Sequence, residues 1–321
     1  MRSAGYSGEI VVVGDEPWRP YNRPPLSKEG LTGELSHERL AFRVRSTAED
    51  VVWRLGETAV SSDLDSRSVT LDDGSRIDYD VLVAATGVRA RRMQLPGPPQ
   101  TAAARRHVVR TLEDAAVLRA HLVPGANVVV LGAGFIGCEV AASAVTLGCE
   151  VRCVAIDQVP MQRPLGIELG AELRRRHESH GVEFHLGVGL AEFVGDHVVT
   201  DVVLTDGTRL ACDVLVEALG SRCNVEWLQG NDLDLSDGVV TDGALRPVRG
   251  GTAVDGVAVV GDLARFPNPR FDDEPRRVEH WSIPTDSGRR AGAVLNAYLS
   301  AEGYQDVVTA PWDVLPAFWS D

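Results

Sequence analysis

The sequence lacks the marks of a membrane-inserted, secreted or metal-binding protein. No apolar run approaches the roughly 20 residues that a membrane-spanning helix needs, and residues 1–30 contain no apolar core with a cleavage site, as a signal peptide would. The five cysteines form no C-x-x-C pair and no set with metal-ligand spacing. Basic residues are also scarce, 32 Lys and Arg against 46 Asp and Glu, and the formal net charge of −14 argues against nucleic acid or an anionic membrane as the main partner. We therefore expect a cytoplasmic protein without a metal site, whose cysteines are buried free thiols.

The chain has enough apolar residues for two domains of ordinary size, with 321 residues of which 44% are hydrophobic. Its most informative stretch, residues 128–154, predicts a βαβ unit. An apolar run, Val128–Leu131, enters the glycine-rich sequence GAGFIG at 132–137. An Ala-rich helical stretch follows, and Val151–Ala155 is typical of a second strand.

Each glycine of this turn has a separate expected role. Gly132 allows the tight exit from the strand, Gly134 lets the backbone approach a pyrophosphate, and Gly137 lets helix and strand pack closely. The turn therefore predicts a dinucleotide site, the alternative being a glycine-rich turn between two buried elements.

The residues after the second strand leave the choice between NAD and NADP open. An acid there would take the adenine ribose hydroxyls and select NAD. Ala155 occupies that position, and the nearest acid is Asp157. Arg152 or Arg163 could instead receive the additional phosphate of NADP.

Two further segments offer groups suited to a nucleotide cofactor. An expected strand, Glu9–Val13, is followed by Asp15 and Glu16, either of which could take a ribose hydroxyl pair or simply form a solvated turn. Three prolines between residues 20 and 25 stiffen the next loop, which presents Arg23 and Lys28 from a defined backbone. Such cations suit a flavin or its pyrophosphate, although a lysine on a loop can also be merely exposed.

Five motifs together carry a family resemblance. They are PYNRPPLSK at 20–28, ATG at 85–87, the glycine-rich βαβ unit, Gly261-Asp262, and RVEHW at 277–281. In this order and spacing the chain resembles the FAD-dependent ferredoxin reductases that serve bacterial oxygenases and P450s, relatives of the apoptosis-inducing-factor family. The lack of a redox-active cysteine pair argues against the disulfide reductase branch.

The resemblance implies an α/β fold of two Rossmann-like, three-layer domains that bind FAD and NAD(P), the second inserted in the first. Residues 1–107 and 231–310 would form the FAD domain, 108–230 the NAD(P) domain, and 311–321 the start of a C-terminal interface domain. The first βα unit of the FAD domain and most of the interface domain would be missing, so we expect a chain truncated at both ends.

The resemblance also implies roles for individual residues. Lys28 would lie beside the flavin ring and pair with Glu139, and Trp281 would cover the isoalloxazine. The cofactor-binding residues would be Asp15, Arg23, Lys28, Val60, Thr86, Gly87, Arg110, Gly132, Gly134, Phe135, Ile136, Gly137, Glu139, Asp157, Arg163, Gly220, Gly261, Asp262, Glu279 and Trp281. The chain departs from the family pattern at Ala218, where glycine is usual and a methyl group is expected to crowd slightly, and at Ser287, where glutamine is common.

The implied function is electron transfer from NAD(P)H through FAD to a [2Fe-2S] ferredoxin, with NAD the expected nucleotide and NADP not excluded. Arg89, Arg91 and Arg92 are candidates for a docking patch. One alternative is a truncated NAD(P)-binding remnant with weak FAD retention and little turnover. Another is an enzyme that uses a different acceptor, such as rubredoxin or a quinone.

Overall fold

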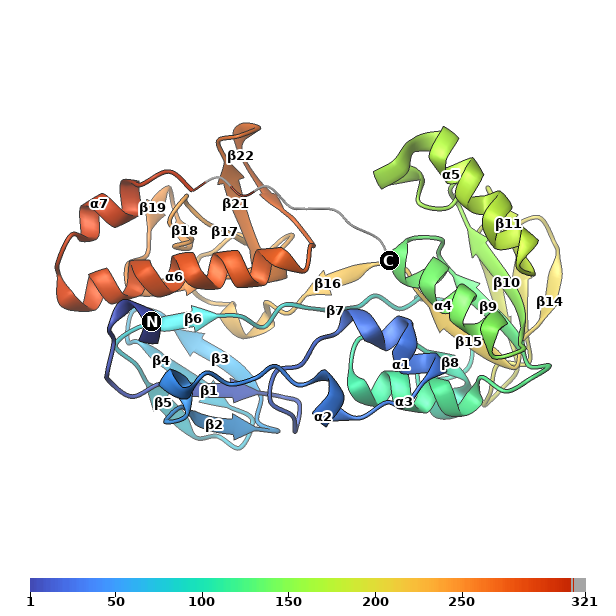
Figure 1. The fold of residues 1–321 in the computed structure, drawn as a ribbon, viewed down its shortest axis with the longest axis horizontal. Helices are drawn as coiled ribbons and strands as arrows, with labels where there is room; N and C mark the ends of the chain where they lie inside the picture. Colours follow the sequence, from blue (N-terminus) through green and yellow to red (C-terminus); the bar gives the residue numbers. More distant parts are fainter. Residues whose placement is uncertain (313, 315–321) are drawn as a thin grey trace. The chain divides into compact units, whose positions relative to one another are not determined.

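The computed structural model describes residues 1–312 and 314, and the chain divides into two compact units. Unit 1 consists of residues 1–20, 42–89 and 222–321, and unit 2 of residues 21–41 and 90–221 (Figure 1). The proline-rich loop therefore packs with the expected nucleotide domain. The boundaries between the FAD and NAD(P) domains expected at 107/108 and 230/231 stay a prediction.

Unit 2 is built on a five-stranded parallel sheet with the order β11-β10-β9-β15-β8. A three-stranded antiparallel sheet, β12-β13-β14, accompanies it. The strands are β8 (Arg106–His107), β9 (Asn127–Leu131), β10 (Glu150–Ala155), β11 (Val182–Leu186), β12 (Leu190–Val194), β13 (Asp201–Leu204), β14 (Arg209–Ala211) and β15 (Val214–Glu217). The helices are α1 (Glu29–Thr32), α2 (His37–Leu40), α3 (Leu112–His121), α4 (Phe135–Thr146) and α5 (Gln162–Ser179), and a 3-10 turn, η2, covers Pro24–Ser27.

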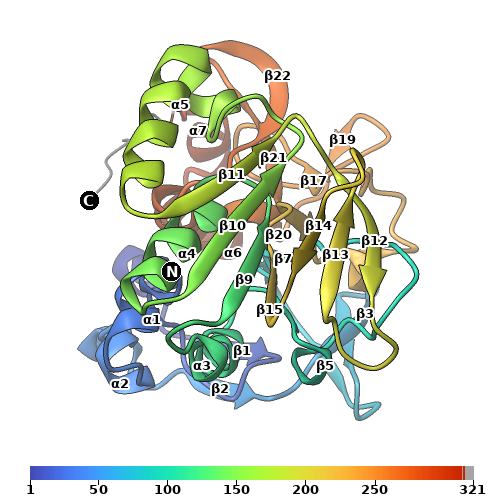
Figure 2. The ribbon, with the colours of Figure 1, turned by 90° about the vertical axis from the view of Figure 1, so that its right-hand side faces the viewer.

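Strand β9 is apolar from Val128 to Leu131 because both of its faces are covered there. Val128 and Val130 belong to the core that α3 and α4 close, whereas Val129 and Leu131 belong to the core shared with β12–β14. Figure 2 shows the helices on one side of the parallel sheet and the antiparallel strands on the other. The predicted α/β class with a parallel sheet is confirmed, and unit 2 has the predicted three layers.

Local signals in the sequence predict several element ends in unit 2. The spacing of Thr111 and Asp114 predicts a capping box, and the structure has it at the start of α3. The apolar residues of 193–204 predict a strand broken near Gly195, and the structure divides this stretch between β12 and β13. The spacing over 165–178 predicts a helix, and α5 begins three residues earlier, with non-helical backbone at Gly166.

Unit 1 contains two pairs of parallel strands, β1-β2 and β20-β6, and two three-stranded sheets, β3-β4-β5 and β17-β21-β22. Its strands are β1 (Val11–Gly14), β2 (Val52–Leu55), β3 (Ala59–Asp63), β4 (Ser68–Leu71), β5 (Arg76–Asp78), β6 (Leu82–Ala84), β17 (Val239–Val240), β18 (Val248–Arg249), β19 (Thr252–Ala253), β20 (Val257–Val259), β21 (Ala264–Asn268) and β22 (Asp272–Arg277). Its helices are α6 (Ser282–Ser300) and α7 (Tyr304–Thr309), and a 3-10 turn, η6, covers Gly261–Leu263. The chain passes between the units at β7 (Val88–Ala90) and β16 (Ser221–Cys223), which pair with each other.

The core of unit 1 lies between α6 and its strands. Ile283, Ala291 and Leu295 of α6 are buried in one cluster with Ala258 and Val259 of β20. This packing fixes the end of β20, from which η6 starts.

Within residues 1–312 and 314, no helix is long and apolar enough to cross a membrane. The same residues contain no cluster of three or more His, Cys, Asp or Glu side chains arranged to hold a metal ion. All five cysteines are free; four are buried as predicted, whereas Cys223 is only half-buried. Burial raises the pKa of Cys138, on α4, to about 12, so this thiol stays protonated.

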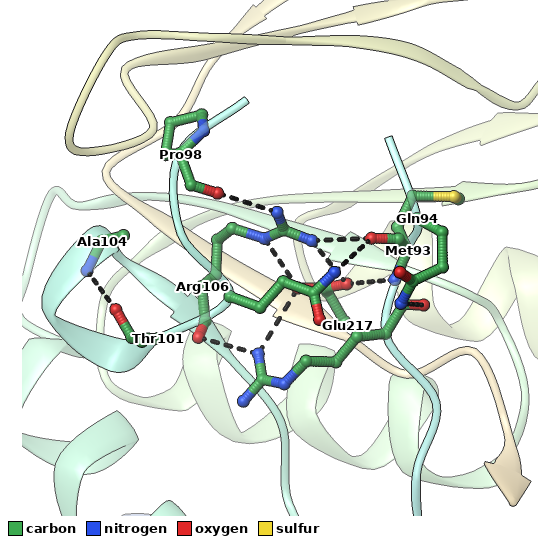
Figure 3. Close-up of polar contacts among 9 residues, drawn as sticks. Met93, Gln94, Pro98, Thr101, Ala104, Arg106 and Glu217 are labelled. Atoms are coloured by element: carbon green, nitrogen blue, oxygen red, sulfur yellow. Dashed lines mark hydrogen bonds and ion pairs between the residues drawn. The ribbon is translucent and has the colours of Figure 1, made fainter. Parts of the chain in front are cut away.

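A buried ion pair ties the end of β15 to the segment before α3 (Figure 3). The Arg106 and Glu217 side chains are 1% and 0% exposed, and the guanidinium donates from Nε at 3.0 Å and Nη2 at 3.2 Å to the two carboxylate oxygens. Its other N–H groups donate to the carbonyls of Pro98 and Met93, each at 3.0 Å. Glu217 also accepts from the Met93 amide at 2.5 Å and lies 3.5 Å from Nη1 of Arg92. The network therefore satisfies a buried charge while fixing the chain around residue 93.

The network also rests on the second core of unit 2. The Arg106 guanidinium lies 4.1 Å from the ring centroid of Phe193, on β12, a cation–π distance. Because Glu217 is the last residue of β15, its fixed side chain also fixes the backbone that continues into Ala218.

We expect Glu217→Gln to lower the free energy of unfolding by about 3 kcal/mol or more, because Arg106 would keep a buried charge without its counter-ion. Urea denaturation followed by circular dichroism at pH 7 measures this loss. The matched control is Glu178→Gln, which breaks an exposed pair with Arg174 on α5 of the same unit and should cost less than about 1 kcal/mol. Equal losses of unfolding free energy in the two variants would show that the Arg106–Glu217 pair contributes no more than an exposed ion pair.

Candidate functional site

The glycine-rich turn places a helix N-terminus at the carboxyl end of β9. Gly134 is the N-cap of α4 and has no side chain, so no side-chain cap bonds the first-turn amides. Gly134, Phe135 and Ile136 are exposed, and the turn is anchored by the Gly132 amide, which donates to the Val154 carbonyl at 2.8 Å. Backbone amides at a helix N-terminus are groups that can bind a phosphate.

The glycines of this turn allow backbone segments to approach too closely for a side chain. A Cβ on Gly137 would lie 1.9 Å from the Gly132 carbonyl oxygen, and one on Gly132, whose φ is 103°, would lie 2.3 Å from the Ala218 carbonyl oxygen. By contrast, a Cβ on Gly134 would meet no atom within 4 Å. The close packing predicted at Gly137 is present, and Gly132 makes a close approach as well, whereas the predicted approach of Gly134 to a pyrophosphate stays a prediction.

The methyl group of Ala218 leaves ordinary space on the side of Gly137. A Cβ built on Gly137 would lie 3.5 Å from the Ala218 Cβ, a van der Waals distance. The slight crowding expected from this methyl group stays a prediction.

The proline-rich loop brings Lys28 to Glu139 of α4. The Lys28 Nζ lies 3.3 Å from one carboxylate oxygen of Glu139, with side-chain exposures of 36% and 28%. The other oxygen accepts from the Ser27 hydroxyl at 2.5 Å. The predicted contact between Lys28 and Glu139 is present, and the sequence did not indicate Ser27.

Arg23 and Arg110 meet at the start of α3. Arg23 Nη1 donates to the Arg110 carbonyl at 2.7 Å and to the Tyr21 hydroxyl at 3.1 Å. The Tyr21 hydroxyl accepts from the Leu112 amide at 2.9 Å. These contacts hold the loop against the α3 N-terminus, and the cofactor roles of both arginines stay a prediction.

Two of the residues considered for the adenine ribose lie near the carboxyl end of the parallel sheet. Asp157 is half-buried two residues after β10, and Arg163 is exposed near the start of α5. Arg152 donates to the side chain of Asn127, the first residue of β9, at 2.9 Å, and therefore lies toward the opposite end of the sheet. The suggestion that Arg152 could receive a ribose phosphate is wrong.

The three arginines considered for docking already make contacts. Arg92 donates to the Arg106 carbonyl and lies 3.5 Å from Glu217, with 23% of its side chain exposed. Arg89 pairs with Glu226 at 2.5 Å, and the Arg91 amide donates to the Gly220 carbonyl at 2.9 Å. A docking role for the three arginines stays a prediction.

In unit 1, the turn after β6 is fastened to the segment after β16. Thr86 Oγ1 donates to the Asn224 carbonyl at 2.7 Å and accepts from the Trp227 indole at 3.2 Å. The Asn224 side chain donates to the Thr86 carbonyl at 2.9 Å, and its amide donates to the Gly87 carbonyl at 2.9 Å. Gly87 has φ 58°, which favours glycine.

The turn that carries Asp262 is held from α6. The Gly261 amide donates to the Ser287 hydroxyl oxygen at 2.9 Å, and this hydroxyl donates to the Ile283 carbonyl at 2.5 Å. Ser287 is fully buried, so the residue found here instead of glutamine has a structural role. Arg277 contacts both the Asp262 carbonyl, at 3.5 Å, and the Glu279 carboxylate, at 2.5 Å.

The remaining candidates of unit 1 lie on its surface. Trp281 is 50% exposed at the start of α6, with its ring centroid 5.6 Å from that of His280. Asp15 is exposed directly after β1, and Val60 is 49% exposed on β3. Their cofactor roles stay predictions.

Sequence reasoning missed three polar residues around the site. The signal for Glu217 was available, since an acid directly after Val214–Val216 continues a buried strand and needs a partner. Ser27 and Ser143 gave no such signal, because a serine in a loop or a helix is compatible with exposure. Ser143 Oγ donates to the Ser27 carbonyl at 2.8 Å, and both residues are buried.

Comparison with known proteins places the chain among flavin and nicotinamide enzymes. The model of the family described as "Pyridine nucleotide-disulphide oxidoreductase" matches residues 1–288. The ferredoxin–NAD(+) reductase component of the p-cumate 2,3-dioxygenase system of Pseudomonas putida is 34% identical over 322 residues, which cover 100% of this chain and 74% of that protein. The ferredoxin reductase for the CYP199A2 system of Rhodopseudomonas palustris has a TM-score of 0.83 and 35% identity, covering 92% of this chain and 71% of its own. The structure of a covalent putidaredoxin reductase–putidaredoxin complex gives a TM-score of 0.87 and 30% identity. The match covers 100% of this chain and 74% of the chain in that structure.

The glycine contacts lead to opposite expectations for two similar substitutions. Gly137→Ala should lower the free energy of unfolding by about 3 kcal/mol, because its Cβ would overlap the Gly132 carbonyl and force the backbone apart. Gly134→Ala should change it by about 1 kcal/mol or less, since the Cβ meets no atom and φ is −82°. Chemical denaturation of both variants measures the difference, and equal stabilities would show that the close approach is not a constraint.

Proposed function

Because the chain belongs to the pyridine nucleotide-disulphide oxidoreductase family, we propose that it is an FAD-dependent reductase that passes electrons from NADH to a [2Fe-2S] ferredoxin of an oxygenase or P450 system. The names of its relatives support the ferredoxin partner and the nicotinamide nucleotide. When bound, FAD supplies the chemistry that connects a two-electron hydride donor to a one-electron acceptor.

One observation carries the proposal most directly. Helix α4 begins after Gly134, an N-cap residue without a side chain, and one turn further on it carries the carboxylate of Glu139 with Lys28 beside it. The first feature suits the pyrophosphate of NADH. The second supplies a fixed pair of opposite charges near the reacting end of the nucleotide, as the resemblance implies.

We assign NADH to the glycine-rich turn of unit 2. The amides following Gly134 would bind the pyrophosphate, and the Asp157 carboxylate would accept from the adenine ribose hydroxyls. Gly132 and Gly137 act indirectly, by letting the turn pack. Arg163 is the group through which NADPH would be accepted instead.

The polar groups of unit 1 fit FAD. Asp262, on a turn fastened by Ser287, would accept from a ribityl hydroxyl, and the backbone at Thr86 and Gly87 would approach the cofactor. Asp15 is the candidate for a ribose hydroxyl pair. The remaining members of this proposed set are Val60, Gly261, Glu279 and Trp281. For Arg23, Arg110 and Gly220 we keep the cofactor-binding role that the resemblance implies.

The second candidate function is a nucleotide-binding protein that retains FAD weakly and turns over little. It is favoured by the sheets of unit 1, where β1-β2 and β20-β6 form separate pairs that no strand of the described residues joins. A dinucleotide crevice in an open α/β sheet normally lies between contiguous parallel strands.

A cytoplasmic location is part of the proposal. It is supported by the five free cysteines, four of them buried, because thiols persist in reducing compartments.

The visible spectrum of the purified protein distinguishes the two functions. We expect a near-stoichiometric flavin band that NADH bleaches under anaerobic conditions, with NADPH less effective. Gly134→Ala should retain the flavin but bind NADH roughly tenfold more weakly or worse, because its methyl group would occupy the approach to the pyrophosphate. A colourless protein that still binds NADH would support the second candidate, and a protein that binds neither would contradict both.

A further inference from the structure

We propose that Ser27 is a positioning residue: its hydroxyl fixes the orientation of the Glu139 carboxylate, and this orientation presents the second carboxylate oxygen to Lys28. This inference rests on the proposed function, which gives Lys28 and Glu139 their place near the reacting atoms. It adds a residue to which neither the sequence motifs nor the family resemblance assigned a role.

The two oxygens of Glu139 have different donors. Oε2 accepts from the Ser27 hydroxyl at 2.5 Å, and Oε1 lies 3.3 Å from Lys28 Nζ. The Ser27 hydroxyl is also 3.5 Å from the Pro24 carbonyl, but its single proton is directed by the much shorter distance to the carboxylate. A length near 2.5 Å is typical of a hydroxyl that donates to an ionised carboxylate.

Ser27 is much better suited than Lys28 to fix this carboxylate. Ser27 is 1% exposed, and a single side-chain torsion separates its backbone from its hydroxyl oxygen. The Lys28 side chain is 36% exposed and carries its ammonium group on a flexible four-carbon chain. A lysine alone attracts the carboxylate but leaves its plane free to rotate. The serine removes that freedom.

The backbone that carries Ser27 is itself fixed. It ends the 3-10 turn η2, which two prolines begin, and its neighbour Leu26 is 2% exposed. On α4, Ser143 lies one turn after Glu139 and donates to the Ser27 carbonyl at 2.8 Å. One face of α4 therefore both anchors the loop, through Ser143, and receives its hydroxyl, through Glu139.

Anchoring and positioning can be separated by variants that remove one contact each. Ser27→Ala removes the donor to Glu139 and keeps the backbone carbonyl that Ser143 binds. Ser143→Ala removes the anchor and keeps both donors on Glu139. Ser27→Thr restores a hydroxyl, and Ser179→Ala, which removes an exposed hydroxyl bonded to the Arg176 carbonyl on α5, is the matched control.

The readouts are the steady-state constants for NADH-dependent reduction of ferricyanide and the carboxyl ¹³C NMR signal of Glu139. Protein labelled with [5-¹³C]glutamate provides this signal, which Glu139→Gln identifies by its loss. We expect Ser27→Ala to shift the signal and to lower kcat roughly tenfold or more, with little change in KM for NADH, because the carboxylate would be misplaced without loss of nucleotide contacts. Ser27→Thr should recover both, and Ser143→Ala and Ser179→Ala should leave the signal in place.

Several outcomes would overturn the proposal. If Ser27→Ala and Ser143→Ala behaved alike, Ser27 would only anchor the loop, and if Ser27→Ala matched the wild type, it would have no role. If Ser27→Ala did not fold, Ser27→Cys, with similar volume and a weaker donor, would take its place in the same comparison. A wild-type protein that NADH does not reduce would contradict the proposed function alone, because the carboxyl signal would still test the contact between Ser27 and Glu139.

Discussion

The close approach of backbone segments at the glycine-rich turn is the constraint on which unit 2 depends. Gly137 of α4 lies against the Gly132 carbonyl, and Gly132 lies against the carbonyl of Ala218. The first contact sets how near the helix N-terminus comes to β9, and the second sets the position of the chain leaving β15. Glu217, one residue earlier, is fixed by the buried network with Arg106. The parallel sheet, the turn and the network therefore determine one another's positions.

Helix α4 contributes both to this packing, through Gly137, and to the candidate site, through Glu139. Its first two residues, Phe135 and Ile136, are exposed, and its next turn carries Glu139, which pairs with Lys28. The balancing group comes from the proline-rich loop, more than 100 residues away in the sequence. The loop reaches α4 through buried side chains and the serine contacts, and it reaches α3 through Arg23 and Tyr21. The same helix thus combines an N-terminus of the kind that binds phosphate with a charged pair, a combination that suits a nicotinamide nucleotide whose reacting end must be held in place.

Much of this arrangement followed from the sequence because it depends on local rules. An apolar strand leading into spaced glycines and the Thr111–Asp114 capping box carried clear signals, and the structure has the corresponding elements. The contact between Lys28 and Glu139 came from family resemblance and not from any pattern in the residues. Ser27 and the bidentate Arg106–Glu217 pair depend on which segments meet in three dimensions, which spacing along the chain does not encode. Arg152 was misjudged for a related reason: its position on β10 was predicted, but its contact with Asn127 required the register of two strands.

The central claim is that NADH bound at the turn before α4 donates hydride to a flavin held by the same protein. Anaerobic stopped-flow measurement of flavin bleaching, with NADH and with NADH deuterated at C4, tests it most directly. We expect bleaching that saturates with NADH concentration and is slower with the deuterated nucleotide, because the C4–H bond breaks in the measured step. A protein that retains flavin and binds NADH, yet whose flavin is not bleached, would contradict the account.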